Sequence, residues 1–180
     1  MKIAIDLDDT IVDRSNYIYD LEVRELGRYV NYTDNVDDEL KQKYIELIKR
    51  NIRQYHRYGK PFDGALAKIR EWHNAGHEII IITARGMGWL ELSSIDEKDD
   101  TIYWLLKNKV PYDALVFTED KGRYAKDLGI NIFLEDSVSM CENIIKLSSN
   151  TKVFAKRNDY NRSLSGKVAM FDTFDEINIE

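Results

Sequence analysis

Short runs of apolar, β-branched residues alternate along this chain with longer stretches in which apolar residues recur every three or four positions. Residues 3–5 and 79–82 are apolar without alternation, which is typical of strands covered on both faces of a parallel sheet. Further strands are predicted at Ala114–Phe117, 130–134, 152–155 and 168–171. Strands that alternate with helices predict an α/β fold, a Rossmann-like parallel sheet flanked by helices.

The stretches with helical spacing predict that the segments between these strands are helices. Predicted helices run from Ser15, taken as the N-cap, through Leu26; from about Asp37 to Gly59; over 65–72; through 102–106; near 124–128; and from Ser137 to about Leu147. A short helix is expected at the end of the chain.

Residues 14–60 interrupt the α/β rhythm directly after the first strand, because they contain two predicted helices and no strand. We therefore expect a core of residues 1–13 and 61–180 with a small helical cap, residues 14–60, inserted after the first strand. The cap holds seven of the 11 Tyr, and residues 49–60 are basic without an acid. The tyrosines either stack on a base of the ligand or pack the two cap helices together; they include Tyr17, Tyr19, Tyr44, Tyr55 and Tyr58.

Composition narrows the classes of function. The chain has 180 residues with 26 Lys+Arg against 32 Asp+Glu, a net charge of −6, so it lacks the basic face of nucleic-acid-binding proteins. A single cysteine, Cys141, excludes an intramolecular disulfide and a multi-thiolate zinc site. Any bound metal should therefore have oxygen ligands. No apolar run approaches the roughly 20 residues of a membrane span, and no signal peptide is evident, so we expect a cytoplasmic protein.

The first predicted strand runs directly into Asp6-Leu7-Asp8-Asp9-Thr10. Ligands of parallel sheets bind beyond the carboxyl ends of the strands. Of two acids spaced by one residue, one can bind a hard cation and attack an electrophile while the other moves a proton. The competing interpretation is an acidic turn in which Asp9 or Asp13 caps the next helix.

Two further strand ends carry groups that suit a phosphate. Thr83-Ala84-Arg85 follows residues 79–82, and its hydroxyl and free backbone N–H groups fit phosphate oxygens. Lys121 follows the third core strand. Taken singly, these residues are equally compatible with a turn and a solvated lysine.

A fourth strand end carries Glu135 and Asp136. Both place negative charge at the sheet edge where Asp6 is expected, and like charges there are costly unless a cation joins them. Helix capping by Asp136 or Ser137 is the alternative.

The ordered set of these four strand ends resembles the haloacid dehalogenase superfamily of aspartyl phosphotransferases, over about three quarters of the chain. Asp6 and Asp8 match the first motif, Thr83 the second, Lys121 the third and Asp136 the fourth. The resemblance implies that Asp6 attacks a phosphate monoester and forms an aspartyl-phosphate. It also implies that Asp8 protonates the leaving group and then activates water.

The resemblance further implies a Mg²⁺ cofactor and a division of roles. The metal ligands would be the Asp6 carboxylate, the Asp8 backbone carbonyl and Asp136. Thr83, Ala84 and Lys121 would bind the phosphate. Thr10, Arg85 and Glu135 would lie near the substrate or support these groups from behind. Lys126 stays open as an alternative to Lys121. Glu135 stands where the family commonly has Asp or Gly, so either Asp136 binds metal alone or Glu135 joins through water.

Several stretches resemble 5'(3')-deoxyribonucleotidases and their bacterial relatives: residues 59–65, 83–85, 110–113, 133–137 and 158–162. This resemblance implies a small phosphomonoester substrate, a deoxyribonucleoside monophosphate, and a role in deoxyribonucleotide catabolism. The alternative is a phosphatase for a sugar phosphate or a polysaccharide precursor. A non-catalytic phosphate-binding protein is a more remote alternative. We expect no nucleic-acid polymer or membrane as partner, and a homodimer is compatible with the sequence.

Overall fold

The computed structural model describes residues 1–30, 36–87 and 94–179. Six strands form one sheet in the order β5-β4-β1-β6-β7-β8, and every pairing within it is parallel. The strands are β1 (Lys2–Ile5), β4 (Glu78–Thr83), β5 (Ala114–Phe117), β6 (Ile132–Glu135), β7 (Lys152–Lys156) and β8 (Ala169–Phe171). The predicted parallel α/β fold is confirmed.

Six helices accompany the sheet: α1 (Ser15–Leu26), α2 (Asp38–Tyr58), α3 (Ala65–Asn74), α4 (Ser94–Lys107), α5 (Lys121–Leu128) and α6 (Val138–Leu147). Two short 3₁₀ helices, Arg162–Leu164 and Phe174–Glu176, lie near the end of the chain. Helix α5 begins three residues earlier than predicted because the Asp120 side chain accepts a hydrogen bond from the Arg123 N–H and caps it. Strand β6 begins two residues later than predicted.

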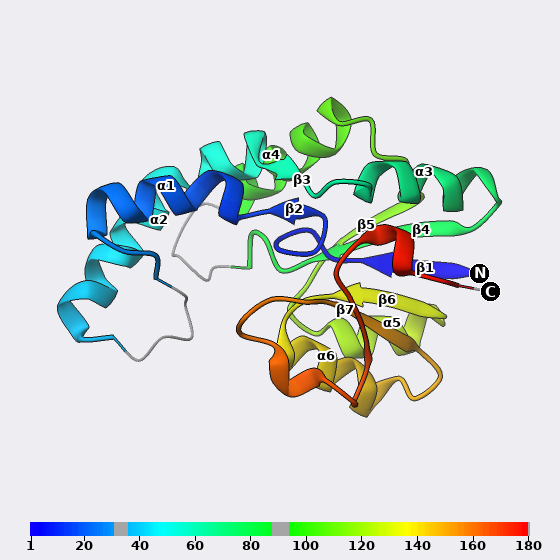
Figure 1. Ribbon diagram of the computed structural model, residues 1–180. Helices are drawn as coiled ribbons and strands as arrows, with labels where there is room; N and C mark the ends of the chain where they lie inside the picture. The colour runs from blue at the N-terminus through cyan, green and yellow to red at the C-terminus, as the bar shows by residue number, and fades with distance from the viewer. Residues whose placement is uncertain (31–35, 88–93, 180) are drawn as a thin grey trace.

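Alternate residues of the central strands face two different helical layers. Ile79 and Ile81 pack in one apolar cluster with residues of α3 and α4, whereas Ile80 and Ile82 pack in a second cluster with residues of α5 and α6. Figure 1 shows these helix pairs on opposite sides of the sheet. Burial on both faces explains why these strands read as continuous apolar runs.

Helices α1 and α2 lie between two short strands that the sequence did not predict. Strands β2 (Val12–Asp13) and β3 (Lys60–Pro61) pair antiparallel, where the chain leaves and rejoins the sheet region. Ser15 was expected to cap α1, which is wrong. Instead the Asp13 carboxylate accepts hydrogen bonds from the Ser15 backbone N–H (2.9 Å) and hydroxyl (2.6 Å).

Helix α2 is joined to the rest of the molecule by packing and by charge. Its buried residues Tyr44, Ile48, Ile52 and Tyr55 belong to the same apolar cluster as strand β1. Arg53 and Arg57 of α2 both donate to the fully buried Asp100 of α4. Helices α1 and α2 therefore share the core of the sheet. Among the described residues, no helix combines the length and apolarity needed to cross a bilayer.

Helices α5 and α6 approach closely at Gly122. Its N–H donates to the Asn143 side-chain oxygen at 2.6 Å. A Cβ at Gly122 would lie 2.5 Å from the Asn143 backbone oxygen, so only glycine fits. This contact fixes the first turn of α5, where Lys121 lies.

Candidate active site

The predicted site residues lie at the carboxyl edge of the sheet. The strand order reverses direction between β1 and β6, which makes this pair the topological switch point of the fold. Asp6 follows β1, and its backbone N–H donates to the Leu134 carbonyl of β6. The next residues form a tight loop in which the N–H groups of Ile11 and Val12 donate to the carbonyl of Leu7. The loop therefore holds the acids beside the end of β6.

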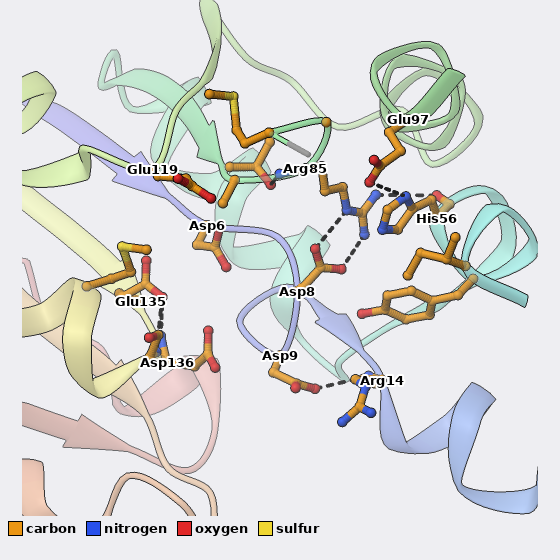
Figure 2. Close-up of a pocket in the computed structure, with 18 of the residues that line it drawn as sticks. Asp6, Asp8, Asp9, Arg14, His56, Arg85, Glu97, Glu119, Glu135 and Asp136 are labelled. Carbon is orange, nitrogen blue, oxygen red and sulfur yellow. Dashed lines mark hydrogen bonds and ion pairs between the residues drawn. The ribbon is translucent and has the colours of Figure 1, made fainter. Parts of the chain in front are cut away.

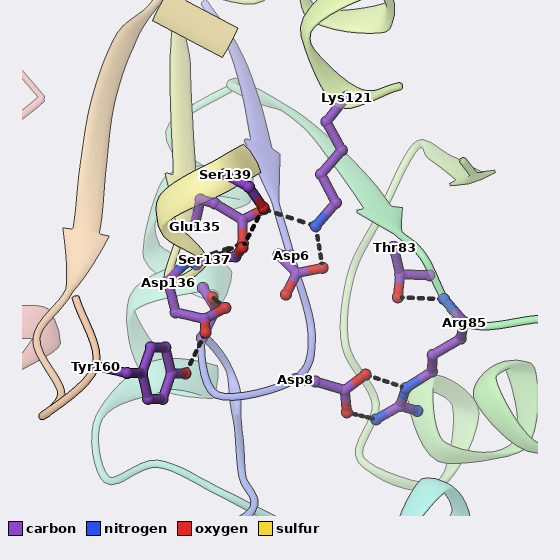
Figure 3. Close-up of polar contacts among 11 residues, drawn as sticks. Asp6, Asp8, Thr83, Arg85, Lys121, Glu135, Asp136, Ser137, Ser139 and Tyr160 are labelled. Carbon is purple, nitrogen blue, oxygen red and sulfur yellow. Dashed lines mark hydrogen bonds and ion pairs between the residues drawn. The ribbon is translucent and has the colours of Figure 1, made fainter. Parts of the chain in front are cut away.

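Lys121 lies between two carboxylates (Figure 3). Its Nζ is 2.6 Å from Asp6 Oδ1 and 2.6 Å from Glu135 Oε2, and all three side chains are at least nine-tenths buried. The other Glu135 oxygen accepts the backbone N–H groups of Asp136 and Ser137, both at 3.0 Å. Glu135 is thus held in place by three residues, and it orients Lys121 toward Asp6.

Asp136 is held by two hydroxyl groups. Thr10 is fully buried and donates to Asp136 Oδ1 at 3.2 Å. The Tyr160 hydroxyl donates to the other Asp136 oxygen and lies 3.3 Å from Asp9 Oδ2. Asp9 has a left-handed backbone (φ 54°), which Asp tolerates better than most residues. Thr10 thus supports Asp136 from behind and does not line the cavity.

Asp8 points away from this cluster and pairs with Arg85. The guanidinium donates from Nε to Asp8 Oδ2 at 2.8 Å and from Nη2 to Asp8 Oδ1 at 2.5 Å. A third guanidinium nitrogen, Nη1, lies 3.4 Å from the His56 carbonyl. The Thr83 hydroxyl accepts the Arg85 backbone N–H at 3.3 Å. Arg85 therefore connects the ends of β1 and β4 to helix α2.

The crowded carboxyl groups titrate abnormally. Burial raises the pKa of Asp6 to about 7, with Glu135 and Asp8 acting in the same direction and Lys121 opposing them. Burial also raises the pKa of Asp9 to about 6 and the pKa of Asp136 well above its usual range. These carboxyl groups lack sufficient positive charge around them.

Asp8 and His56 shift the other way. Burial opposes ionisation of Asp8, but the Arg85 guanidinium outweighs it and lowers the pKa of Asp8 well below its usual range. Burial and the Arg85 charge lower the pKa of His56 to about 3. Asp8 is therefore a carboxylate and His56 a neutral imidazole at physiological pH.

A cavity of about 340 Å³ opens over these groups (Figure 2). The sheet edge supplies its polar floor, and α2 and α4 supply one wall. The lining residues include Asp6, Asp8, Thr83, Ala84, Arg85, Lys121, Glu135 and Asp136 from the predicted set, and Tyr44, Ile48, Ile52, Tyr55, His56, Met87 and Glu97 beside them.

Three of the acids form a cluster that could hold a metal ion. Asp6, Glu135 and Asp136 each offer a carboxylate oxygen, and these oxygens lie within 4.8 Å of one another. Hard oxygen donors of this kind suit Mg²⁺. The raised pKa values of Asp6 and Asp136 fit a site that requires a cation. Asp6 and Asp136 are the metal ligands expected from the sequence, and Glu135 is engaged by Lys121 and by two backbone N–H groups.

The structure separates some predicted residues from the site. Lys126, the alternative to Lys121, is exposed on α5. Among the tyrosines, Tyr44 and Tyr55 line the cavity, whereas Tyr19 and Tyr58 do not. The side chain of Tyr17 lies outside the described part of the chain.

Sequence reasoning assigned no role to several lining residues, among them His56, Glu97, Arg14 and Tyr160. No motif marks His56 or Glu97, which are brought together by the packing of α2 on α4. Tyr160 belongs to the stretch 158–162 that resembles the nucleotidases, and this was the only signal for it.

Two bacterial proteins are similar to this chain over nearly its full length. A protein of Bacillus cereus named "Putative nucleotidase" is 26% identical over 92% of this chain and 90% of its own length. A second one with this name, from Oceanobacillus iheyensis, is 24% identical over 97% of this chain and 96% of its own length. No protein-family model matches the chain.

Solved structures match the fold. A haloacid dehalogenase-like hydrolase of Streptococcus pneumoniae superposes with a TM-score of 0.63 at 11% identity, covering 97% of this chain and 95% of its own. D,D-heptose 1,7-bisphosphate phosphatase of Burkholderia thailandensis gives a TM-score of 0.59 at 10% identity, and the match covers 96% of this chain and 92% of that chain. This chain therefore has the haloacid dehalogenase-like fold, and in sequence it resembles bacterial proteins named as nucleotidases.

Proposed function

We propose that this protein is a Mg²⁺-dependent phosphomonoesterase that hydrolyses nucleoside monophosphates, preferably deoxyribonucleotides, through an aspartyl-phosphate on Asp6. The observation that carries the proposal is the convergence of Asp6, Lys121 and Asp136 in one cavity, with Asp8 beside them. The similarity to two proteins named as nucleotidases supports the choice of substrate.

In the proposed reaction an Asp6 oxygen attacks phosphorus while the bond from phosphorus to the leaving oxygen breaks. Asp8 gives its proton to that oxygen. Water then attacks the phosphorus of the aspartyl-phosphate, and Asp8 takes the proton from this water. Inorganic phosphate leaves, and the Asp6 carboxylate is restored.

The other residues bind charge during these steps. Lys121 and the Thr83 hydroxyl would hold phosphoryl oxygens, together with the backbone around Ala84. Asp6, Asp136 and the Asp8 carbonyl would hold Mg²⁺, with Thr10 and Tyr160 orienting Asp136. When bound, the metal would neutralise negative charge on the phosphate and the carboxylates.

The Asp8–Arg85 ion pair has a consequence for this mechanism. Arg85 donates hydrogen bonds to both oxygens of Asp8 and so keeps it ionised, and an ionised carboxylate has no proton to donate to the leaving oxygen. Arg85 must therefore release Asp8 when substrate binds. A phosphate ester is the natural competitor, since guanidinium binds phosphate with the same two-pronged geometry as carboxylate.

The test is phosphate release from nucleoside monophosphates, sugar phosphates and p-nitrophenyl phosphate, with and without Mg²⁺. We expect the fastest turnover with a deoxyribonucleotide and Mg²⁺, and no turnover by Asp6→Asn. Asp8→Asn should bind substrate but turn over slowly. Uniform rates on nucleotides, with one sugar phosphate much faster, would favour the sugar-phosphate alternative. Tight phosphate binding without turnover of any ester would favour a binding protein. The homodimer and the cytoplasmic location stay predictions.

A further inference from the structure

His56 is a buried side chain with one ring nitrogen that makes no hydrogen bond within the described residues. It lies on α2, is 3% exposed and lines the cavity. Its Nδ1 has no hydrogen-bond partner in the part of the chain that the structure describes. Glu97 Oε2 lies 3.9 Å from Nδ1, which is beyond hydrogen-bonding distance. An unpaired buried polar group costs about 1–3 kcal/mol, so such a group calls for an explanation.

The position of His56 relative to Asp8 suggests one. Arg85 bridges the two residues, with Nε and Nη2 on the Asp8 carboxylate and Nη1 at the His56 carbonyl. Figure 2 shows His56 and Glu97 on the Asp8 side of Asp6, away from Asp136. In the proposed mechanism Asp8 protonates the leaving oxygen. The part of the substrate beyond that oxygen therefore extends toward His56 and Glu97.

The wall around His56 is otherwise mostly apolar. Ile48, Ile52 and the ring of Tyr55 line it from the same helix, and Met87 lines it from the loop after β4. In such pockets a few polar groups fix the orientation of the ligand. A neutral imidazole offers one donor and one acceptor, and so can pair with a hydroxyl group or with the edge of a base.

We propose that His56, with Glu97 beside it, binds a hydrogen-bonding group on the nucleoside part of the substrate and so selects for that leaving group. This inference rests on the proposed function and adds a specificity-determining residue to it. The phosphate and metal groups at the sheet edge would accept any phosphate monoester. Discrimination between esters would come from His56 on α2.

The test compares His56→Phe with the unchanged protein on three substrates. A deoxyribonucleoside monophosphate carries sugar and base, deoxyribose 5-phosphate carries the sugar alone, and p-nitrophenyl phosphate carries neither. We expect the ratio of kcat/KM for the nucleotide to that for p-nitrophenyl phosphate to fall by about 10- to 100-fold, the loss of one buried hydrogen bond. A similar fall with deoxyribose 5-phosphate assigns the contact to a sugar hydroxyl; no fall assigns it to the base.

The matched control is His73→Phe, since His73 lies on α3 outside the cavity and is partly exposed. It should leave the ratio unchanged. If His56→Phe does not fold, Glu97→Gln, which keeps the side-chain shape, should lower the same ratio. A ratio that stays at the unchanged protein's value in a folded His56 or Glu97 variant overturns the inference.

A binding measurement separates this inference from the catalytic proposal. In the Asp6→Asn protein, calorimetry compares the affinity for a nucleoside monophosphate with that for inorganic phosphate. We expect the nucleotide to bind more tightly, and the added His56→Phe change to remove that advantage while phosphate binding persists. Equal affinities before the His56 change would overturn the inference even if the enzyme hydrolyses phosphate esters. Tight nucleotide binding without turnover would contradict the catalytic proposal alone.

Discussion

Lys121→Met tests the charge balance at the floor of the cavity. The Lys121 ammonium lies 2.6 Å from an oxygen of Asp6 and 2.6 Å from an oxygen of Glu135, and its side chain is 3% exposed. Methionine retains most of the lysine volume, so the change removes charge rather than packing. Two buried carboxylates then face each other without a counter-charge.

Removing one partner of a buried ion pair costs about 3–5 kcal/mol. Because Lys121 contacts two carboxylates, we expect the free energy of unfolding of the metal-free protein at about pH 8 to fall by an amount near the upper end of that range. The loss should shrink on acidification. Lys121 opposes the rise in the pKa of Asp6, so without Lys121 this pKa rises further above its unfolded value. The folded state then takes up a proton before the unfolded state as the pH falls, and this restores stability.

The assay is urea unfolding of the metal-free protein, followed by circular dichroism from about pH 5 to about pH 8. Lys126→Met is the matched control, because Lys126 lies on the same helix and is exposed; it should change stability by no more than about 0.5 kcal/mol. Only Lys121→Met should also abolish phosphate release. A loss below about 1 kcal/mol, or one that does not vary with pH, would refute the assigned charge balance.

Three further predictions follow from the same geometry. Arg85→Met and Asp8→Asn should show a coupling of about 1–3 kcal/mol in a double-mutant cycle of unfolding free energies; strictly additive losses would contradict the ion pair. In the metal-free protein the raised pKa of Asp6 means that the folded state binds more protons than the unfolded state, so stability should fall as the pH rises from about 4 to about 7. Mg²⁺ should therefore raise the melting temperature more above pH 7 than near pH 5, and Asp136→Asn should abolish this rise; a shift independent of pH would argue against carboxylate ligands. Gly122→Ala should lower the free energy of unfolding by about 1–3 kcal/mol, because its Cβ would push α5 away from α6, and this loss would be measured as a lower melting temperature. An unchanged melting temperature would show that the two helices can move apart at this contact without loss of stability.

The sequence predicted the parts of the fold that have strong local signals. The apolar runs at β1 and β4 correctly predict strands, because both faces of these strands are covered by helices. The start of α5 was placed too late because its first turn, Lys121-Gly122-Arg123, contains no apolar residue to show helical spacing. The two-residue strands β2 and β3 are too short for any periodicity.

The candidate site divides in the same way. Residues that follow strands could be brought together by topology, since parallel strands end at one edge, and this places Asp6, Lys121 and Asp136 in one cavity. His56 and Glu97 meet only because two helices pack together, and no spacing in the sequence expresses that contact. The Arg85–Asp8 pairing also needed coordinates, since it depends on a side-chain conformation between residues 77 positions apart.

The small β2–β3 ladder brings the two ends of the helical segment together. Asp13 pairs with Lys60, so the two ends of the insertion meet about 5 Å apart, the spacing of neighbouring strands. A segment of another length or shape could be joined at these two residues without moving the sheet. Simple deletion would fail, because α2 buries part of the common apolar core. We predict that replacing this one segment of chain would change the substrate range of the proposed phosphatase.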